Sequence, residues 1–182
     1  MRQGDWIQTW TGIKFYPLDP LESEICLGDI VTPLSRICRF IGHSLHFYSV
    51  AEHSVHVANH VSEENRLWAL LHDASEAYMC DLPRPLKYME EARFYRDAEK
   101  KLQGIICAKF GLAPGMPDEV RIADNRMLAT EARDLMPNKP DEWGNMLEPY
   151  TDVDLRYECL DVIKSYNLFC NSLNDELRRL EG

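Results

Sequence analysis

The chain has 182 residues, 45% of them hydrophobic and 27% charged, a balance that excludes disordered and collagen-like chains and predicts one globular domain over residues 1–182. The 30 acidic residues outnumber the 20 basic ones, so the formal net charge is −10. This charge argues against binding to a nucleic-acid backbone, because lysine and arginine supply most of that affinity. It permits a small anionic substrate where basic residues gather.

The first predicted elements are a short hairpin and two helices. Residues 6–16 alternate polar and apolar side chains around a Thr-Gly turn, which is the pattern of a β-hairpin. Apolar residues then recur every three or four positions over 29–41, which predicts a helix. Ser49 is a suitable N-cap for a further helix over about 50–61.

The rest of the chain is predicted to be mainly helical. Apolar stripes and end signals place helices at about residues 62–79, 87–110, 118–135 and 154–180. Residues 81–85 should form a rigid loop because they contain two prolines, Gly111 should end the helix before it, and 138–152 should be a polar loop. These elements predict an all-α helical bundle with a small N-terminal β-hairpin. The last helix either packs on the core or serves an oligomer interface.

The sequence shows no membrane or secretory signal. Its apolar runs are far shorter than the roughly 20 residues of a membrane span, and its polar start lacks a signal-peptide core. The six cysteines are scattered without a Cys-x-x-Cys pair, which favours reduced thiols that mostly fill the core. We therefore expect a cytoplasmic protein.

The pair His72-Asp73 is the most informative feature of the sequence. Consecutive helical residues diverge by about 100°, so both side chains reach one ion only if it lies off the edge of the helix. Imidazole nitrogen and carboxylate oxygen together suit Zn, Mn, Fe, Co or Ni. Glu76 lies one turn later on the same face, where a carboxylate could act on a water at the metal. The alternative is a histidine paired only with its neighbouring acid.

Further ligands are expected on the neighbouring helices. His53, His56 and His60 lie near one helix face, so either one of them is a ligand and the others are solvated, or they form a site of their own. His53 is the better candidate, because a following antiparallel helix could bring His72 close to it. Asp124 is an acid among apolar residues and is the candidate fourth ligand, the alternative being a capping or salt-bridged aspartate.

The set of His53, His72-Asp73 and Asp124 resembles the H…HD…D pattern of the HD-domain metal-dependent phosphohydrolases. The resemblance covers roughly residues 30–135. It implies that these four residues hold a divalent transition metal such as Zn, Co or Mn. Additional Mg, Co or Mn would accompany the substrate phosphates.

Three longer segments resemble the branch of this family that contains bacterial 5′-deoxynucleotidases. They are Tyr-Ser-Val-Ala-Glu-His-Ser at 48–54, Leu-His-Asp-Ala-Ser-Glu-Ala at 71–77 and Asp-Leu-Pro-Arg-Pro-Leu-Lys at 81–87, with Cys80 before the third. The Trp-Ile-Gln-Thr-x-Thr-Gly stretch at 6–12 and the compact size resemble phage-type dATP triphosphohydrolases.

The resemblance implies a role for each matching residue. Glu76 would activate or position the attacking water, and Asp81 would be an acid that faces the leaving group or that water. Lys87 and Arg121 would contact phosphate oxygens. The remaining substrate-binding candidates are Arg39, which lies about 14 residues before His53, and Phe40 and Pro85, which could touch the base or sugar.

The resemblance therefore implies a metal-dependent deoxynucleotide phosphohydrolase. The leading expectation is a dATP triphosphohydrolase that releases deoxyadenosine and triphosphate by water attack at the α-phosphorus. The alternatives are a 5′-deoxynucleotidase acting on dNMPs, a non-catalytic nucleotide-binding HD module, and a structural protein with an incidental His-Asp pair. A homo-oligomer, either a dimer or a hexamer, is expected, in the bacterial host cytoplasm if the chain is phage-encoded.

Overall fold

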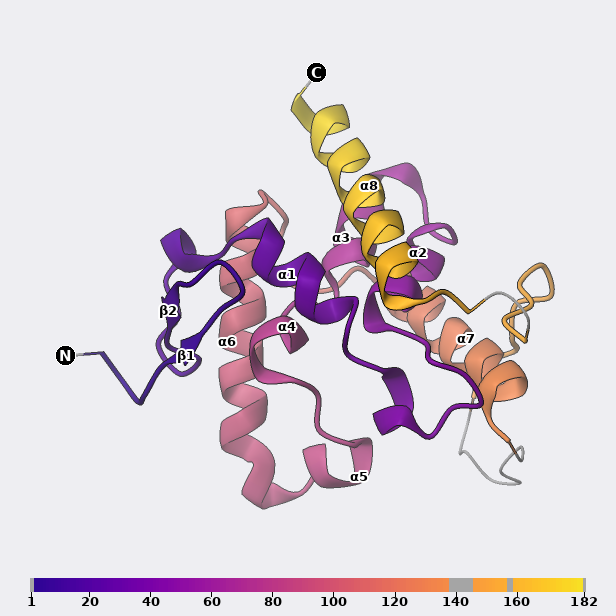
Figure 1. The fold of residues 1–182 in the computed structure, drawn as a ribbon, viewed down its shortest axis with the longest axis horizontal. Coiled ribbons are helices and arrows are strands. Elements are labelled where there is room, and N and C mark those ends of the chain that lie inside the picture. Colours follow the sequence, from indigo (N-terminus) through magenta and orange to yellow (C-terminus); the bar gives the residue numbers. More distant parts are fainter. Residues whose placement is uncertain (1, 138–145, 157–158, 182) are drawn as a thin grey trace.

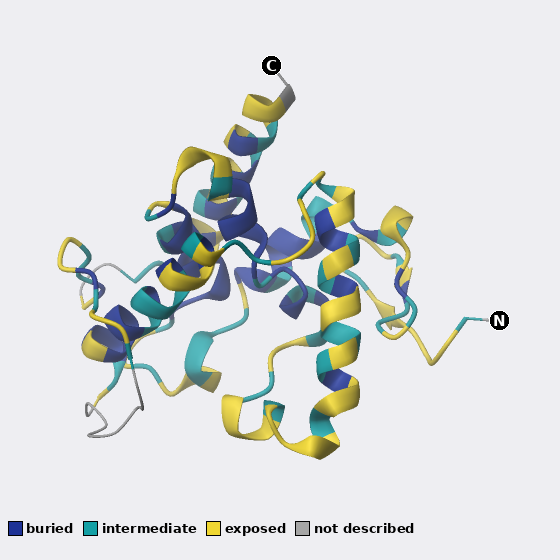
Figure 2. Ribbon diagram, turned by 180° about the vertical axis from the view of Figure 1, so that it is seen from behind, coloured by how far each residue is buried: buried dark blue, intermediate teal, exposed yellow. Residues whose placement is uncertain are grey.

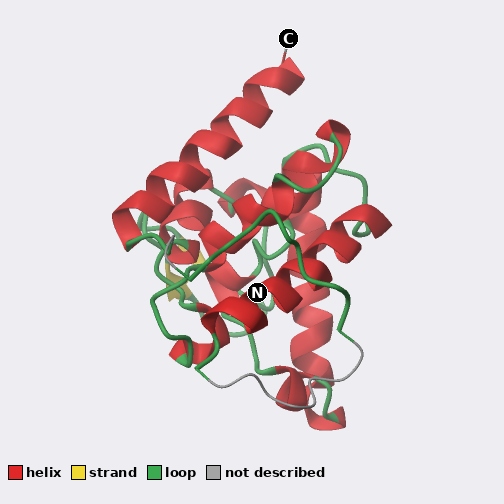
Figure 3. Cartoon of the chain, turned by 90° about the vertical axis from the view of Figure 1, so that its right-hand side faces the viewer, coloured by secondary structure: helices red, strands yellow, loops and turns green. Residues whose placement is uncertain are grey.

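The computed structural model describes residues 2–137, 146–156 and 159–181, most of them helical. The helices in chain order are α1 (Leu27–Leu34), α2 (Val50–Ala58), α3 (Arg66–Leu71), α4 (Glu76–Met79), α5 (Arg84–Lys87), α6 (Arg93–Lys109), α7 (Asp118–Leu135) and α8 (Val162–Glu181). Helix α6 stands beside the N-terminal hairpin, and α8 crosses over α2 and α3 (Figure 1). The same arrangement is seen from the side in Figure 3.

The predicted hairpin is present as β1 (Ile7–Gln8) and β2 (Lys14–Phe15), which pair in antiparallel register with Ile7 opposite Phe15. Phe15 is fully buried, and its ring stacks on that of Tyr78 with 4.3 Å between centroids. Aromatic contacts of this kind stabilise beyond the area they bury, so the stack fixes the small hairpin to the helical core. The all-α fold with an N-terminal β-hairpin is confirmed.

The predicted helix over 29–41 was placed too far along the chain. Helix α1 ends at Leu34, and the following residues extend to pair with the segment before α2. Val50 N–H donates to Ile37 C=O at 3.1 Å, and Arg39 N–H donates to Tyr48 C=O at 2.8 Å. This non-local pairing overrides the helical spacing of the apolar residues.

The start of α2 agrees with the predicted cap. The Ser49 hydroxyl accepts a hydrogen bond from the Glu52 N–H at 3.0 Å, which satisfies one of the amide groups left open at a helix start. The helix ends at Ala58, three residues before the predicted position. It therefore begins where the sequence indicates and places His53 in its second turn.

The predicted single helix over 62–79 is wrong, because the chain breaks between α3 and α4. A continuous helix would join the Ser75 N–H directly to the Leu71 C=O. Here the amide of Gln103, on α6, lies between them: its Oε1 accepts from Ser75 N–H at 3.2 Å and its Nε2 donates to Leu71 C=O at 2.7 Å. An inserted side chain is a recognised cause of helix kinks. His72 and Asp73 lie inside this break.

Two other boundaries also differ from the prediction. The prolines do not keep all of 81–85 in a loop: Pro83 is the N-cap of α5 and Pro85 lies in its first turn, where the missing N–H costs nothing. Helix α6 begins at Arg93 rather than at residue 87, and it ends before Gly111, whose φ is +67° as a left-handed cap requires.

The C-terminal part agrees with the prediction only in places. Helix α7 spans Asp118–Leu135, as predicted, whereas α8 begins at Val162, eight residues after the predicted start. Of the predicted polar loop over 138–152, residues 138–145 lie outside the described residues, and the rest contains no helix or strand. The predicted loop therefore agrees with the structure over residues 146–152.

The hydrophobic core lies where α2 packs against the neighbouring helices. Helix α2 packs against α3, α7 and α8, and α1 packs against α4. Figure 2 shows the buried residues gathered at the centre and the exposed ones around the periphery, including α5 and one side of α6. The largest core side chains include Ile30, Leu34, Leu70, Leu71, Leu102, Ile106, Met127 and Phe169. Ser165, Phe169 and Leu173 of α8 are buried, so this helix packs on the core.

All six cysteines are described and are free thiols, but only Cys107 is fully buried and Cys80 is exposed. We expected most of the cysteines to fill the core, but Cys107 alone is fully buried there. Among the helices in the described ranges, none combines the length and the apolar character that crossing a bilayer requires.

Candidate metal centre

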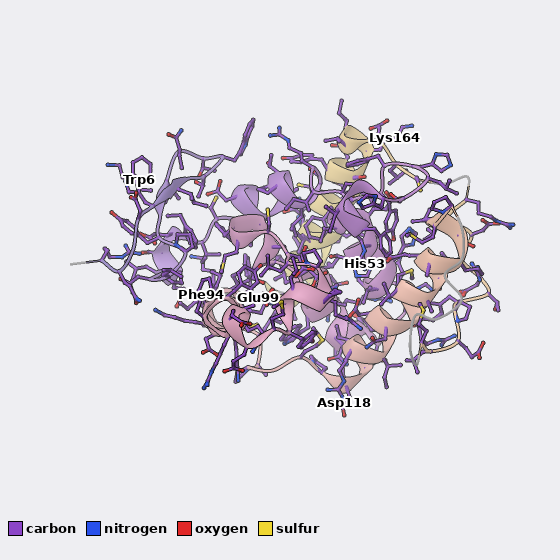
Figure 4. The ribbon with its side chains drawn as sticks, turned by 90° about the horizontal axis from the view of Figure 1, so that it is seen from below. Trp6, His53, Phe94, Glu99, Asp118 and Lys164 are labelled. Atoms are coloured by element: carbon purple, nitrogen blue, oxygen red, sulfur yellow. The ribbon has the colours of Figure 1, made fainter. Side chains whose placement is uncertain are left out.

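The four predicted ligands meet at one point from three parts of the fold. His53 comes from α2, His72 and Asp73 from the break after α3, and Asp124 from α7. The two imidazole Nε2 atoms are 3.3 Å apart. Asp124 Oδ1 lies 3.2 Å from His53 Nε2 and 3.8 Å from His72 Nε2, and Asp73 Oδ2 lies 3.2 Å from His72 Nε2 and 3.9 Å from His53 Nε2. Figure 4 shows His53 near the centre of the molecule.

The hydrogen bonds at Nδ1 orient both histidines. His72 Nδ1 lies 2.6 Å from the Ala69 C=O, and His53 Nδ1 lies 2.5 Å from Glu131 Oε1. A carbonyl or an ionised carboxylate only accepts hydrogen bonds, so this network assigns the Nδ1 proton to each neutral ring. When both rings are neutral, as metal binding requires, their Nε2 lone pairs point at each other and at the carboxylates, which is the arrangement of histidines that bind a metal.

The carboxylates make the centre of the cluster favourable for positive charge. Burial lowers the pKa of His72, but the carboxylates of Asp73 and Asp124 more than offset this and raise it to about 9. Burial likewise raises the pKa of Asp73, but His72, His53 and Arg39 outweigh it and hold that pKa well below its ordinary value. Because His53, His72 and Asp73 each offer a ligand atom within 4.8 Å of the others, this group could hold a metal ion.

A buried carboxylate and a buried guanidinium stand behind the ligands. Glu131 is fully buried, and its Oε2 accepts a hydrogen bond from Arg39 Nε at 3.0 Å and forms an ion pair with Arg39 Nη2, also at 3.0 Å. Arg39 Nη1 lies 3.7 Å from Asp73 Oδ2. Burial raises the pKa of Glu131, but Arg39 and His53 outweigh it and lower that pKa, so the carboxylate is ionised. Glu131 was not predicted, although it follows Asp124 by seven residues and therefore shares its face of α7.

The predicted catalytic acids lie on the side of the cluster formed by α4 and the loop after it. Glu76 is buried at the first position of α4, and burial, together with Asp73 and Asp81, raises its pKa well above the ordinary value. The side chain of Asp81 is 45% exposed and accepts a hydrogen bond from Lys87 Nζ at 2.7 Å.

The predicted substrate-binding residues are only partly gathered. Lys87 lies at the site's edge through its bond to Asp81 and also donates to Glu99 Oε1 at 2.8 Å. Phe40 adopts a φ of +55° and its ring packs 5.6 Å from the Arg39 guanidinium carbon. Pro85 is exposed on α5.

Arg121 lies on the outer surface of α7. Its side chain is 60% exposed and pairs with Asp118 at 2.5 Å, and Figure 4 places Asp118 at the periphery of the molecule. Among the described residues, no hydrogen bond or ion pair joins Arg121 to the four ligands.

The other histidines of α2 have separate surroundings. The His56 ring stacks near Tyr48, and burial lowers the pKa of His56 to about 4. His60 packs on the Tyr150 ring at 3.9 Å, and its Nε2 lies 3.5 Å from Asp152 Oδ2. Of these three histidines, His53 alone joins the cluster.

No protein-family model matches the chain. The chain is similar to the uncharacterized protein YfdR of Escherichia coli, with 39% identity over 181 residues that cover 96% of this chain and 98% of YfdR. It is also similar to an uncharacterized protein of Rhodobacter capsulatus, with 31% identity over 127 residues, 65% of this chain and 64% of the relative. The near-complete match to YfdR, from one end of both chains to the other, shows that the chain belongs to the YfdR family.

Proposed function

We propose that the chain is a metal-dependent phosphohydrolase of the HD-domain type that acts on deoxynucleotides, with dATP as the leading substrate. The observation that carries the proposal is the meeting of His53, His72, Asp73 and Asp124. These residues are spread over more than 70 positions of sequence, yet each carboxylate has an oxygen 3.2–3.9 Å from both imidazole Nε2 atoms.

The donor set fits a divalent transition metal. Two imidazole nitrogens with fixed Nδ1 protons and two ionised carboxylates match the preferences of Zn, Co or Mn, and four ligands leave room in the coordination shell. A cation bound there would polarise a phosphoryl oxygen and make a nearby water more acidic.

Two acids of the chain would handle the protons. Glu76 is the group to which we assign the proton of the attacking water, because it is a buried carboxylate at the start of α4, one helical turn after His72. Attack forms a new bond from the water oxygen to the α-phosphorus and breaks the bond from phosphorus to the 5′-oxygen. That oxygen leaves as a hydroxyl after it takes a proton, and we assign the donation of this proton to Asp81. From dATP the products are deoxyadenosine and triphosphate.

The positions of the basic groups favour a second candidate, a 5′-deoxynucleotidase. Arg39 is held by Glu131 and Asp73, Lys87 by Asp81 and Glu99, and Arg121 by Asp118. A triphosphate requires more positive charge than a monophosphate does. The neutralised cations therefore favour a dNMP over a dNTP.

A product assay tests both candidates. The protein is incubated with Co²⁺, Mn²⁺ or Zn²⁺ and with each dNTP, each dNMP and ATP, and the products are separated by chromatography. Deoxyadenosine and triphosphate from dATP support the leading proposal, whereas phosphate from dNMPs with intact dNTPs supports the deoxynucleotidase. An absence of turnover with every metal contradicts both.

The variant Glu76→Gln tests the assigned base. We expect turnover to fall about 10²–10⁴-fold, since that is the usual contribution of a positioned acid or base, while metal binding persists. Glu52→Gln is the matched control: Glu52 is also buried with a raised pKa of about 7, but its carboxylate accepts from the Leu160 N–H instead. Equal activity of the two variants would contradict the role of Glu76.

A further inference from the structure

We propose that Glu131 is a positioning residue for the metal site, and that Arg39 acts with it as a brace rather than as a free substrate contact. The inference rests on the metal site proposed above and deepens it. Glu131 lies behind His53 and touches neither the ligand atoms at the centre nor solvent.

Both oxygens of Glu131 are engaged. Oε1 faces His53 Nδ1 at 2.5 Å, and Oε2 accepts a hydrogen bond from Arg39 Nε at 3.0 Å and lies 3.0 Å from Arg39 Nη2. Burial of an ionised carboxylate costs free energy unless such partners replace the lost water. A fully buried carboxylate that is nevertheless ionised therefore indicates a specific role for its charge.

The brace connects ligands that come from different elements. Glu131 lies on α7, the helix that supplies Asp124, and it holds His53 of α2 directly. Through Arg39 it also reaches Asp73, whose Oδ2 lies 3.7 Å from Arg39 Nη1. Three of the four ligands are thus tied to one carboxylate or to its helix, and the Nδ1 contact fixes the ring orientation and tautomer that leave Nε2 open.

Glutamine at position 131 cannot replace both contacts. If its carbonyl oxygen faces His53, its NH₂ group faces the N–H donors of Arg39. If the amide is reversed, the NH₂ group donates to His53 Nδ1 and drives the proton to Nε2, which removes the ligand lone pair. Either orientation weakens the site, and loss of an outer partner of a metal-bound histidine typically reduces affinity about 10–100-fold.

The experiment measures Co²⁺ binding to the full chain by visible absorption and by calorimetry. Wild type is compared with Glu131→Gln and with Glu131→Asp, which keeps the charge beside Arg39 but withdraws the oxygen from His53. Asp134→Asn is the matched control, because Asp134 is also a buried acid of α7, but it bonds to Arg133 and the Leu155 N–H. We expect both Glu131 variants to bind Co²⁺ about 10–100-fold more weakly with an altered absorption spectrum, and the control to match wild type.

Three results would contradict the proposed role of Glu131. Glu131 variants that bind Co²⁺ with the wild-type affinity and spectrum, and lose only thermal stability, would overturn the positioning role and leave the metal site intact. Equal weakening by Asp134→Asn would overturn it as well, because the effect would then be general to buried acids of α7. A wild-type protein that binds no Co²⁺ would overturn the metal site itself, and the inference with it.

Discussion

The ammonium group of Lys87 lies between two carboxylates, Asp81 Oδ1 at 2.7 Å and Glu99 Oε1 at 2.8 Å. Burial lowers the pKa of Lys87, but these hydrogen bonds more than offset this and raise it, so the side chain carries its charge. A phosphate oxygen that binds Lys87 must compete with both acids. Glu99, which no motif indicated, is therefore a residue that tunes substrate affinity under the proposed function.

The variant Glu99→Gln tests this competition. Removal of one competing charge should lower KM for the anionic substrate about two- to five-fold with kcat unchanged, because partly exposed ion pairs contribute about 0.2–1 kcal/mol. Steady-state kinetics measures the effect, and Glu91→Gln, at an exposed position before α6, is the control. An unchanged or higher KM would show that Lys87 does not contact the substrate.

For single residues, the sequence predicts those side chains whose type and spacing indicate a metal site. His53, His72, Asp73 and Asp124 were predicted as ligands and do converge. Glu131 was missed because a glutamate within a helix has no distinctive neighbours. Only its seven-residue spacing from Asp124 could have indicated a shared face.

Among the elements, the break between α3 and α4 matters most for the site. Gln103 supplies from α6 the donor and the acceptor that a continuous helix would take from Ser75 and Leu71. The regular α-helical hydrogen bonding is interrupted at His72 and Asp73, where Ala74 N–H donates to Leu71 C=O instead, and the two neighbouring side chains reach the same point. The side-chain amide of Gln103 on α6 therefore helps to position the candidate ligands His72 and Asp73, which follow α3.

Replacement of Gln103 by leucine should repair the helix and damage the site. Leucine offers no donor or acceptor, so Ser75 N–H and Leu71 C=O are free to pair and to turn Asp73 away from His72. We expect Co²⁺ affinity to fall at least about tenfold, as for other residues that orient ligands, with helical content by circular dichroism kept or increased. Lys100→Leu, on the exposed side of α6, should change neither property. Undiminished Co²⁺ affinity in Gln103→Leu would contradict this account.

Element boundaries were predictable where the signals are local. Helix α7 has the predicted bounds, and α2 begins after the predicted cap Ser49. The helices over 29–41 and 62–79 were mispredicted because the forces that end them are non-local: strand-like pairing of Cys38 with Ser49, and the inserted amide of Gln103. The spacing of apolar residues in the sequence indicates neither of these two contacts.

For the whole molecule, the candidate site links α2, the end of α3 and α7. A cation that binds only this folded arrangement stabilises it in proportion to the logarithm of its excess over Kd. The site would thus contribute to the free energy of unfolding of the entire domain.

Metal removal should therefore lower the melting temperature. At a 100-fold excess over Kd, bound metal adds about 2.7 kcal/mol, which corresponds to about 5–10 °C for a domain of this size. Thermal unfolding with Co²⁺ and with a chelator measures the difference. Asp124→Asn should abolish most of it, whereas Asp118→Asn, on the exposed start of the same helix, should preserve it. A shift that persists in Asp124→Asn would place the stabilising cation elsewhere.

The way α8 covers α2 also has a consequence for how the protein is made. Ser165, Phe169 and Leu173 of α8 are buried, α8 packs against α2, and the Leu160 N–H just before it donates to Glu52, next to His53. A ribosome releases all four ligands long before it releases this helix. Since α8 packs on α2 only after it has emerged, the nascent chain first carries these four residues without this packing. Under the proposed function, firm uptake of a cation should therefore follow the emergence of α8.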